Sequence, residues 1–428
     1  MLTGSYRKRL DADLTRWVAE GLLSPESASA LRNSVPRDGG ARIPALLGLF
    51  GGLLIAASVS AFVAANWELI PRLTKLVFII LALLGVIGIG ARLERSGARG
   101  GAEAAYTCAV LVFGAGVALV GQMYHLPSDW PGGALLVGFG ALVAAILLRS
   151  SGALVIAIAA LCAWTVGRWD EAGGQLPSLF WAFFLPILWL SATRSSRLVH
   201  HAAVLALIMW FCLLPERWVL HRFEYGLIAY GLALSVAFVA IGSLALSRGG
   251  PRLFSAFLPW GLVGLVLTLG VELVRILDAH EARGAMAIWH SYVGYALALP
   301  AVAALVLTVR SRRFAWPLTA ALVAALLVPV VFWSGSAATL AGKVVVAGLV
   351  LSTAIGLVVA GAGGGMRHFS IAGSLLFFVS VMVLLWQTIG TLLDQSLFFL
   401  VAGALLIGLA VASRRLFARL SPRQEAVS

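Results

Sequence analysis

The distribution of basic residues along a series of hydrophobic segments constrains this chain most strongly. About fourteen apolar stretches follow one another between Ile43 and Ala412, and most approach the roughly 20 residues that a bilayer crossing needs. The short connectors between them are alternately rich and poor in arginine. This alternation is typical of a polytopic membrane protein, so we expect an all-α transmembrane helix bundle.

The number of spans follows from the lengths of the apolar stretches, with boundaries accurate to about 2–4 residues. Residues 132–148 and 152–167 are short for bilayer crossings, which leaves tilted neighbours, a broken helix or a re-entrant pair as alternatives; the last two would reduce the count to twelve. The predicted spans are 43–65, 73–91, 102–123, 132–148, 152–167, 176–193, 199–215, 225–247, 253–275, 287–309, 314–333, 339–360, 368–386 and 395–412.

The positions of lysine and arginine predict the orientation in the membrane. Most of the 31 basic residues lie in the two tails and in alternate connectors. By the positive-inside rule, this side is cytoplasmic and carries both termini. Tryptophans near the opposite ends of the spans agree, because they are typical of an interfacial belt. The basic residues on that opposite side are Arg72, Lys75, Arg168, Arg217, Arg222, Arg275, Arg283 and Lys343.

The chain divides into three predicted parts. Residues 1–42 form an amphipathic cytoplasmic hairpin and linker, residues 43–412 form the bundle, and residues 413–428 form a basic cytoplasmic tail. Gly21 is predicted to end the first helix, and Ser24 to cap the second, which runs to about Leu31. A hairpin of this size cannot bury a core alone, so it packs on itself, on the membrane surface or on a cytoplasmic protein partner.

Composition excludes several classes of protein. The chain is 61% hydrophobic and 11% charged, far from a soluble globular domain. Its net charge of +13 does not predict nucleic-acid binding, because the basic residues are divided among separate membrane connectors. Membrane lipids are the expected electrostatic partners. We predict no cofactor and no metal: the three cysteines lie inside apolar segments, and His200-His201, interpreted as interfacial, has no further ligands nearby.

Polar residues near the outer ends of the spans form the candidate site. Ionisable groups at membrane depth tend to face a bundle interior or a water-filled vestibule. We therefore predict an outward-facing polar pocket, in which Glu272, Glu68 or His125 exchanges a proton. The candidate substrate-binding residues are Asn66, Trp67, Glu68, Gln122, Tyr124, His125, Asp129, Glu272, Arg275 and Lys343.

Ordinary interface chemistry is an alternative for each of these residues. Glu272 and Arg275 have the i,i+3 spacing of a pair along one helix. Asn66 fits a turn-capping residue, Tyr124 a belt aromatic and Lys343 a side chain that snorkels outward. Glu272 is the deepest of the candidate acids and the one for which the functional interpretation is strongest.

Three function classes remain open. A secondary transporter or permease-like protein is favoured by many short-looped spans and by prolines within spans. A membrane enzyme acting on a lipid or lipid-linked substrate would use His125 with Asp129 at headgroup depth. A non-catalytic sensor or assembly factor would use the N-terminal hairpin. An enzyme is less favoured, because the sequence contains no P-loop, HExxH or GxSxG motif and no large external loop.

Several segments resemble a family of bacterial membrane proteins, the domain of unknown function 2157. They are Arg16–Glu26 (RWVAEGLLSPE), Ala65–Arg72 (ANWELIPR) and Gly121–Leu126 (GQMYHL). The resemblance covers about a third of the chain. Residues 388–397 resemble a sister family of unknown function, in which the position of Gln395 is often lysine.

The resemblance implies a bacterial inner-membrane location and supplies no established activity. It also implies that the matching positions have a shared role, whether structural or functional. Those positions are Asn66, Trp67, Glu68, Tyr124 and His125.

Overall fold

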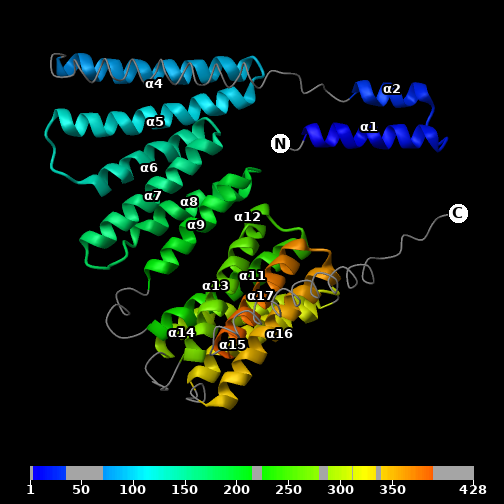
Figure 1. The fold of residues 1–428 in the computed structure, drawn as a ribbon. Helices are drawn as coiled ribbons and strands as arrows, with labels where there is room; N and C mark the ends of the chain where they lie inside the picture. The colour runs from blue at the N-terminus through cyan, green and yellow to red at the C-terminus, as the bar shows by residue number, and fades with distance from the viewer. Residues whose placement is uncertain are drawn as a thin grey trace. The chain divides into compact units, whose positions relative to one another are not determined.

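The all-α prediction is confirmed by the structure, a computed structural model that describes residues 3–34, 71–214, 224–278, 288–310, 312–333 and 339–388. All regular structure in these ranges is α-helical (Figure 1). The chain forms two compact units, Met1–Phe78 and Ile79–Ser428.

The N-terminal residues form a helical hairpin of α1 (Thr3–Ala19) and α2 (Pro25–Ser34). Gly21 follows α1 with φ of 72°, a left-handed conformation that glycine adopts without strain and that ends the helix. The Ser24 hydroxyl accepts a hydrogen bond of 3.1 Å from the backbone N–H of Ser27 and caps α2. Leu14 is only 1% exposed, so the hairpin closes over a small apolar contact of its own.

A series of apolar helices makes up the rest of the described chain. Eight of the described helices are long and apolar enough to cross a membrane, and four shorter apolar helices accompany them. The chain is therefore a membrane protein with several spans. The helices are α4 (Arg72–Arg95), α5 (Arg99–Met123), α6 (Trp130–Leu147), α7 (Ser151–Glu171), α8 (Leu179–Thr193), α9 (Arg197–Leu213), α11 (Glu224–Arg248), α12 (Arg252–Ser255), α13 (Phe257–Asp278), α14 (Ile288–Val309), α15 (Ala315–Trp333), α16 (Leu340–Gly364) and α17 (Arg367–Thr388).

The two spans that looked short from the sequence are complete helices in the structure. α6 has 18 residues and α7 has 21, and each is continuous, so neither is a broken helix. The short helices are elsewhere: α8 has only 15 residues, about 22 Å of helix, and contains Pro186. The predicted spans 43–65 and 395–412 lie outside the described residues.

The arginine-rich connectors of the first half meet at one end of the helices. The Glu103 carboxylate on α5 accepts hydrogen bonds from the Ser150 hydroxyl at 3.0 Å and the Gly152 N–H at 2.6 Å, and so caps α7. The Arg194 guanidinium, which follows α8, donates to the carbonyl of Ala145 at 2.9 Å and to that of Arg149. We call this the arginine-rich end and the other the arginine-poor end.

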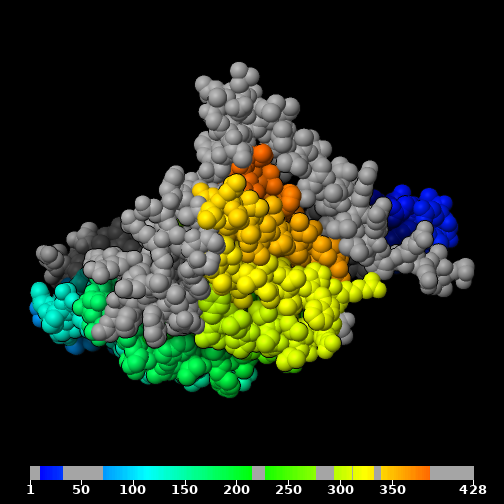
Figure 2. Space-filling model, turned by 90° about the horizontal axis from the view of Figure 1, so that it is seen from below, coloured from blue at the N-terminus to red at the C-terminus, as the bar shows by residue number. Residues whose placement is uncertain are grey.

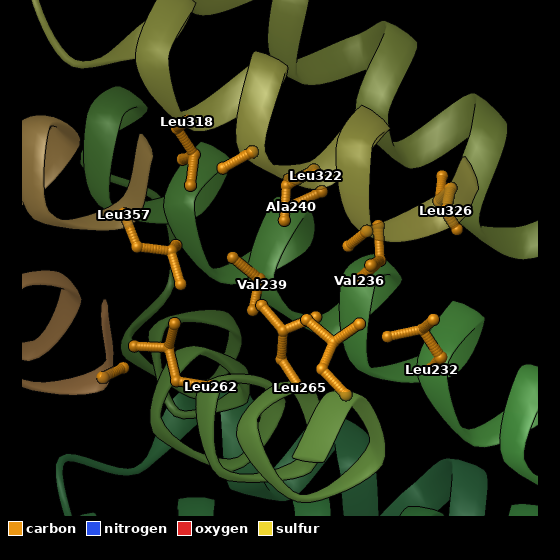
Figure 3. Close-up of a cluster of buried hydrophobic side chains, with 14 of the residues drawn as sticks. Leu232, Val236, Val239, Ala240, Leu262, Leu265, Leu318, Leu322, Leu326 and Leu357 are labelled. Carbon is orange, nitrogen blue, oxygen red and sulfur yellow. The ribbon is translucent and has the colours of Figure 1, made fainter. Parts of the chain in front are cut away.

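The larger apolar core lies among the C-terminal helices. Side chains of α11, α13, α15 and α16 converge there, with Val239 and Leu265 at the centre of the close-up (Figure 3). α15, α16 and α17 lie side by side, as the yellow to orange surface of Figure 2 shows. Glycine permits the closest approach, since a Cβ on Gly261 of α13 would lie 2.7 Å from the Val239 nitrogen of α11.

A second core joins α6, α7, α8 and α9. The Phe180 ring stacks on Phe184 at 5.0 Å and on Trp210 at 4.3 Å between ring centroids. The two cores are linked between α9 and α13, where the Trp260 indole N–H donates to His201 Nδ1 at 3.1 Å. The helices therefore form one connected set within the larger unit.

Large apolar side chains also cover the outside of the helices. Examples are Leu147 on α6, Leu307 on α14 and Leu340 on α16, all strongly exposed. A soluble protein rarely exposes so much apolar surface, whereas hydrocarbon chains of a bilayer cover it without cost. The exposed surface thus agrees with the hydropathy of the helices.

Candidate functional site

Asp129 lies at the arginine-poor end, where it begins α6. Its Oδ1 atom accepts a hydrogen bond of 2.8 Å from the backbone N–H of Gly132, the geometry of a helix N-cap. Its Oδ2 atom lies 2.8 Å from the Arg168 guanidinium near the end of α7. Arg168 also contacts Glu171 at 2.8 Å. Asp129 and Arg168 thus join the start of α6 to the end of α7, and we call this ion pair the clasp.

Electrostatics of the clasp favour the ionised form of Asp129. The hydrogen bond from Gly132 and then the contact with the Arg168 guanidinium hold the pKa of the Asp129 carboxyl below its usual value. Both carboxylate oxygens already have partners, so the geometry is that of a structural cap. A general base beside His125, as the lipid-enzyme interpretation requires, would have to give up one of them.

Gln122, Tyr124 and His125 are exposed around the end of α5. Tyr124 is the C-cap residue, and its backbone N–H bonds to the carbonyl of Val120 at 3.1 Å. His125 has φ of 50°, a left-handed conformation uncommon for a residue other than glycine. The turn brings these three side chains to the same end as Asp129.

Glu272 is enclosed within the C-terminal helices. It lies three residues after Leu269 and seven after Leu265, which places it on the core face of α13. The side chain is 2% exposed, and its Oε2 atom has no hydrogen-bond partner among the residues that the structure describes. Val271 and Val274, its neighbours on the outward face, are exposed. Glu272 is therefore buried in the protein interior, and its depth in the membrane and its role at a site stay predictions.

The surroundings of Glu272 contain two further polar groups. Arg275, one turn along α13, and Tyr295 on α14 both lie within electrostatic range of the carboxylate. The Tyr295 hydroxyl donates a hydrogen bond of 2.8 Å to the Leu326 carbonyl of α15. Leu326 lies three residues before Pro329, which interrupts the hydrogen-bond ladder of α15. Polar groups of α13, α14 and α15 thus gather at one depth.

α11 and α13 are in close contact in the two turns of α13 that precede Glu272. A Cβ on Gly264 of α13 would lie 2.4 Å from the Ser235 hydroxyl of α11. A Cβ on Gly231 of α11 would lie 3.3 Å from a methyl carbon of Thr268. These small residues bring α11 and α13 close together in the two turns before Glu272.

The remaining candidates are less constrained. Lys343 is half-buried on the first turn of α16, which Thr339 caps by accepting from the Gly342 N–H at 3.0 Å. Asn66, Trp67 and Glu68 lie outside the described residues. The structure brings Arg275 into range of Glu272 and joins Asp129 to Arg168, but no described contact joins these two groups to each other.

Sequence reasoning missed several polar residues that the fold uses. Tyr295 and Arg168 were not proposed as partners of the candidate acids. His200, interpreted as interfacial, is 3% exposed, and its Nε2 lies 3.1 Å from the Ser191 carbonyl and 2.9 Å from that of Arg194. An available signal was Asp129 before Trp130-Pro131, which has the pattern of a helix N-cap followed by proline.

The part of the chain that the structure describes contains no candidate metal site. Within those ranges, no group of three His, Cys, Asp or Glu side chains is placed to hold an ion. The three cysteines are free thiols, and Cys108 and Cys212 are exposed on the helix surface.

Comparison with known proteins agrees with the apolar helices. No curated protein and no solved structure matches the chain. The resemblance of residues 388–397 to a sister family stays a prediction. Residues 15–154, which include α5, α6 and the Asp129 cap, match the family described as predicted membrane protein (DUF2157), so this part of the chain has the family resemblance that its sequence motifs predicted.

Proposed function

We propose that this chain is a permease-like secondary transporter, linked to protons through Glu272, in a bacterial inner membrane. The arginine-rich end and both termini would lie in the cytoplasm, by the positive-inside rule. Support comes from the apolar helices, from the arginine-rich connectors that meet at one end and from the match to predicted membrane proteins.

The buried Glu272 carboxylate carries the proposal. Moving an ionised carboxylate from water into a low-dielectric interior costs on the order of several kcal/mol unless a partner offsets it. A bundle that served only as a scaffold would be more stable with an apolar residue on this face of α13. Glu272 instead lies among leucines, and within the described ranges one of its carboxylate oxygens has no hydrogen-bond partner, which fits a group that binds and releases a proton.

The proposed route opens toward the arginine-poor end. Glu272 lies six residues before Asp278, the end of α13, which is about 9 Å along the helix axis. Arg275 and Lys343 would attract an anionic substrate group toward the carboxylate. The remaining candidates would line the entrance at the same end: Asn66, Trp67, Glu68, Gln122, Tyr124, His125 and Asp129.

Two prolines within helices mark positions where α14 and α15 can bend. Pro300 interrupts α14 and Pro329 interrupts α15, on either side of the Tyr295–Leu326 hydrogen bond. Proline removes a ladder hydrogen bond and permits a kink within a transmembrane helix. A bend there would change the enclosure of Glu272, which is the change that alternating access requires of a coupling site.

Proton movement in proteoliposomes tests the proposal. The purified chain is reconstituted with a trapped pH-sensitive dye, and an imposed pH gradient is combined with separate additions of amino acids, organic acids, sugars and quaternary amines. We expect at least one class to accelerate proton movement. Glu272→Gln should abolish the acceleration, because the amide cannot carry the proton, and Glu68→Gln should reduce it.

Glu20→Gln is the matched control, since Glu20 is exposed directly after α1 and distant in sequence from the bundle. It should behave as the original chain. Substrate-stimulated flux that survives both Glu272→Gln and Glu68→Gln would contradict the coupling role. A lipid composition that changes on deletion of the gene and is not restored by a His125→Ala chain would favour the lipid-enzyme interpretation instead.

A further inference from the structure

An apolar groove runs along the surface of the first helices. It has a volume of about 480 Å³ and lies between α4, α5 and α6. This volume is within the roughly 300–1,000 Å³ of sites that bind small organic ligands. Its wall includes Ile87 from α4, Phe113 from α5, and Leu136, Phe139 and Val143 from α6.

The groove exists because the facing helices carry small residues and α4 is loosely packed. Gly140 on α6 faces the Phe113 ring, and a Cβ there would lie 2.3 Å from that ring. Few residues of α4 are buried, and it is held near its arginine-rich end. There the Tyr106 hydroxyl donates to Glu94 at 2.7 Å, and a Cβ on Gly90 would lie 2.5 Å from the Tyr106 ring.

The groove has the length of one leaflet. Its wall on α6 extends from Leu136 to Leu148. Twelve helical steps correspond to about 18 Å, slightly more than half of the roughly 30 Å hydrocarbon core. The groove therefore runs from near the middle of the membrane to the arginine-rich end.

Two guanidinium groups lie where the groove reaches that end. Arg149 directly follows Leu148 and is exposed. The Arg194 guanidinium is fixed beside it by hydrogen bonds to the carbonyls of Ala145 and Arg149. Arg92 and Arg95 end α4 on the other side.

The four arginines at this end outnumber the two acids nearby, so the charge of the acids only partly offsets theirs. Glu94 accepts the Tyr106 hydrogen bond, and Glu103 caps α7. The end of the groove next to these arginines is therefore positively charged, while the groove itself is apolar and has the length of one leaflet.

We propose that this groove binds one acyl chain of an anionic phospholipid from the leaflet at the arginine-rich end, with its phosphate at Arg149 and Arg194. An apolar channel alone would fit any hydrocarbon, but guanidinium groups at the headgroup level select a negative charge. The inference rests on residues separate from Glu272 and holds whether or not the chain transports a substrate.

Another segment of the chain would match the groove less well. Residues 43–65 form an apolar stretch that precedes α4 in the sequence, and they contain no Asp or Glu. Such a segment brings no negative charge to Arg149. A second copy of the chain would present a lipid-facing apolar surface with the same shortcoming. The positive charge at the arginine-rich end of the groove therefore favours the phospholipid.

Lipid binding to the purified full chain tests the inference by native mass spectrometry. The delipidated protein is titrated with phosphatidylglycerol and, separately, with phosphatidylcholine. We expect a preference for phosphatidylglycerol. Arg149→Gln should weaken its binding about fivefold, the effect of one arginine at a membrane surface, and leave phosphatidylcholine binding unchanged. Val143→Trp should weaken the binding of both lipids, because the indole fills the channel.

Matched controls come from the C-terminal helices. Arg367→Gln removes an exposed arginine at the start of α17, and Val323→Trp enlarges an exposed valine on α15. Both should bind lipids as the original chain does. Arg149→Gln keeps the test decisive if the tryptophan variant fails to fold, because this exposed side chain lies outside the core.

Four results would overturn the inference. Equal binding of the two lipids, or an unchanged preference in Arg149→Gln, would show that the arginines do not select the lipid. A dimer that Val143→Trp dissociates would show that a second copy occupies the groove. A cysteine crosslink between residues 43–65 and position 139 that forms in high yield would show that this segment of the chain occupies it.

Discussion

Asp129 and Arg168, 39 residues apart in the chain, form an ion pair of 2.8 Å that joins the start of α6 to the end of α7. The same carboxylate caps α6 through the Gly132 N–H. One side chain thus fixes both a helix start and a helix–helix contact at the arginine-poor end. This relationship accounts for a polar residue at a position where the sequence alone suggested a binding site.

Removal of the Asp129 carboxylate should destabilise the packing of α6 against α7. We expect Asp129→Ala to lower the Tm by about 2–4 °C, because the cap and the Arg168 contact are lost together. Intrinsic fluorescence of the 14 tryptophans measures the transition. Asp170→Ala is the control, since Asp170 is exposed on α7 near the same end, and it should leave the Tm unchanged. Equal Tm values for the two variants would refute the clasp.

The contribution of Asp129 should depend on pH in one direction. Its pKa is lowered in the folded chain, so its stabilising effect is present above the unfolded pKa of about 3.9 and is lost as the pH falls through the folded value. The Tm difference between the original chain and Asp129→Asn should therefore be constant near neutral pH and shrink in stronger acid. A difference that grows on acidification would contradict the assignment.

Glu272 should lower the stability of the fold while it supports proton-coupled flux. We expect Glu272→Leu to keep or raise the Tm, because a buried ionisable group is replaced by an apolar residue of similar size. The same variant should lose any proton-coupled flux. Thermal unfolding and the dye assay are measured on one preparation. A large fall in Tm would mean that the carboxylate is a structural partner, which would count against the coupling role.

Close contact between α11 and α13 gives a prediction that is independent of function. Gly261→Ala places a methyl group 2.7 Å from the Val239 nitrogen, and backbone cannot move aside as a flexible side chain can. We expect a loss of about 1–3 kcal/mol in the free energy of unfolding. Gly348→Ala on α16 is the control, because nothing lies within 4 Å of its added Cβ. It should be neutral or slightly stabilising.

The N-terminal hairpin offers a test between function classes. We expect a chain lacking residues 1–36 to insert, fold and support the same proton flux, because the proposed coupling site lies on α13. The sensor or assembly interpretation predicts the opposite: the deletion would abolish the cellular function while the bundle survives. Flux in proteoliposomes and complementation in cells, measured for the same deletion, separate these outcomes.

The sequence was sufficient to predict the class of fold and several local features. Continuous hydropathy predicts membrane helices because every backbone polar group in lipid has to be satisfied within its own helix. The Gly21 stop and the Ser24 cap follow from local backbone chemistry. The burial of Glu272 was predictable because its spacing from Leu265 and Leu269 puts it on their face of α13.

Contacts between segments distant in the chain were harder to predict from the sequence. Arg168 was assigned correctly to the arginine-poor side, yet its contact with Asp129 depends on how α6 and α7 pack. The burial of His200 was not predicted for a similar reason, because its Nε2 contacts are carbonyls at the end of α8; its interfacial position stays a prediction. α7 also extends beyond its apolar stretch, since polar residues such as Arg168 and Glu171 continue the helix.

Protonation of Glu272 is the most direct test of the central proposal. Infrared difference spectra of the chain in lipid nanodiscs, recorded from about pH 5 to pH 9, follow the carbonyl band that only protonated carboxyl groups show. We predict a titrating band that is absent in Glu272→Gln and retained in Glu20→Gln. A spectrum of the original chain that matches that of Glu272→Gln at every pH would mean that Glu272 exchanges no proton, and the proton-linked transporter would then be rejected.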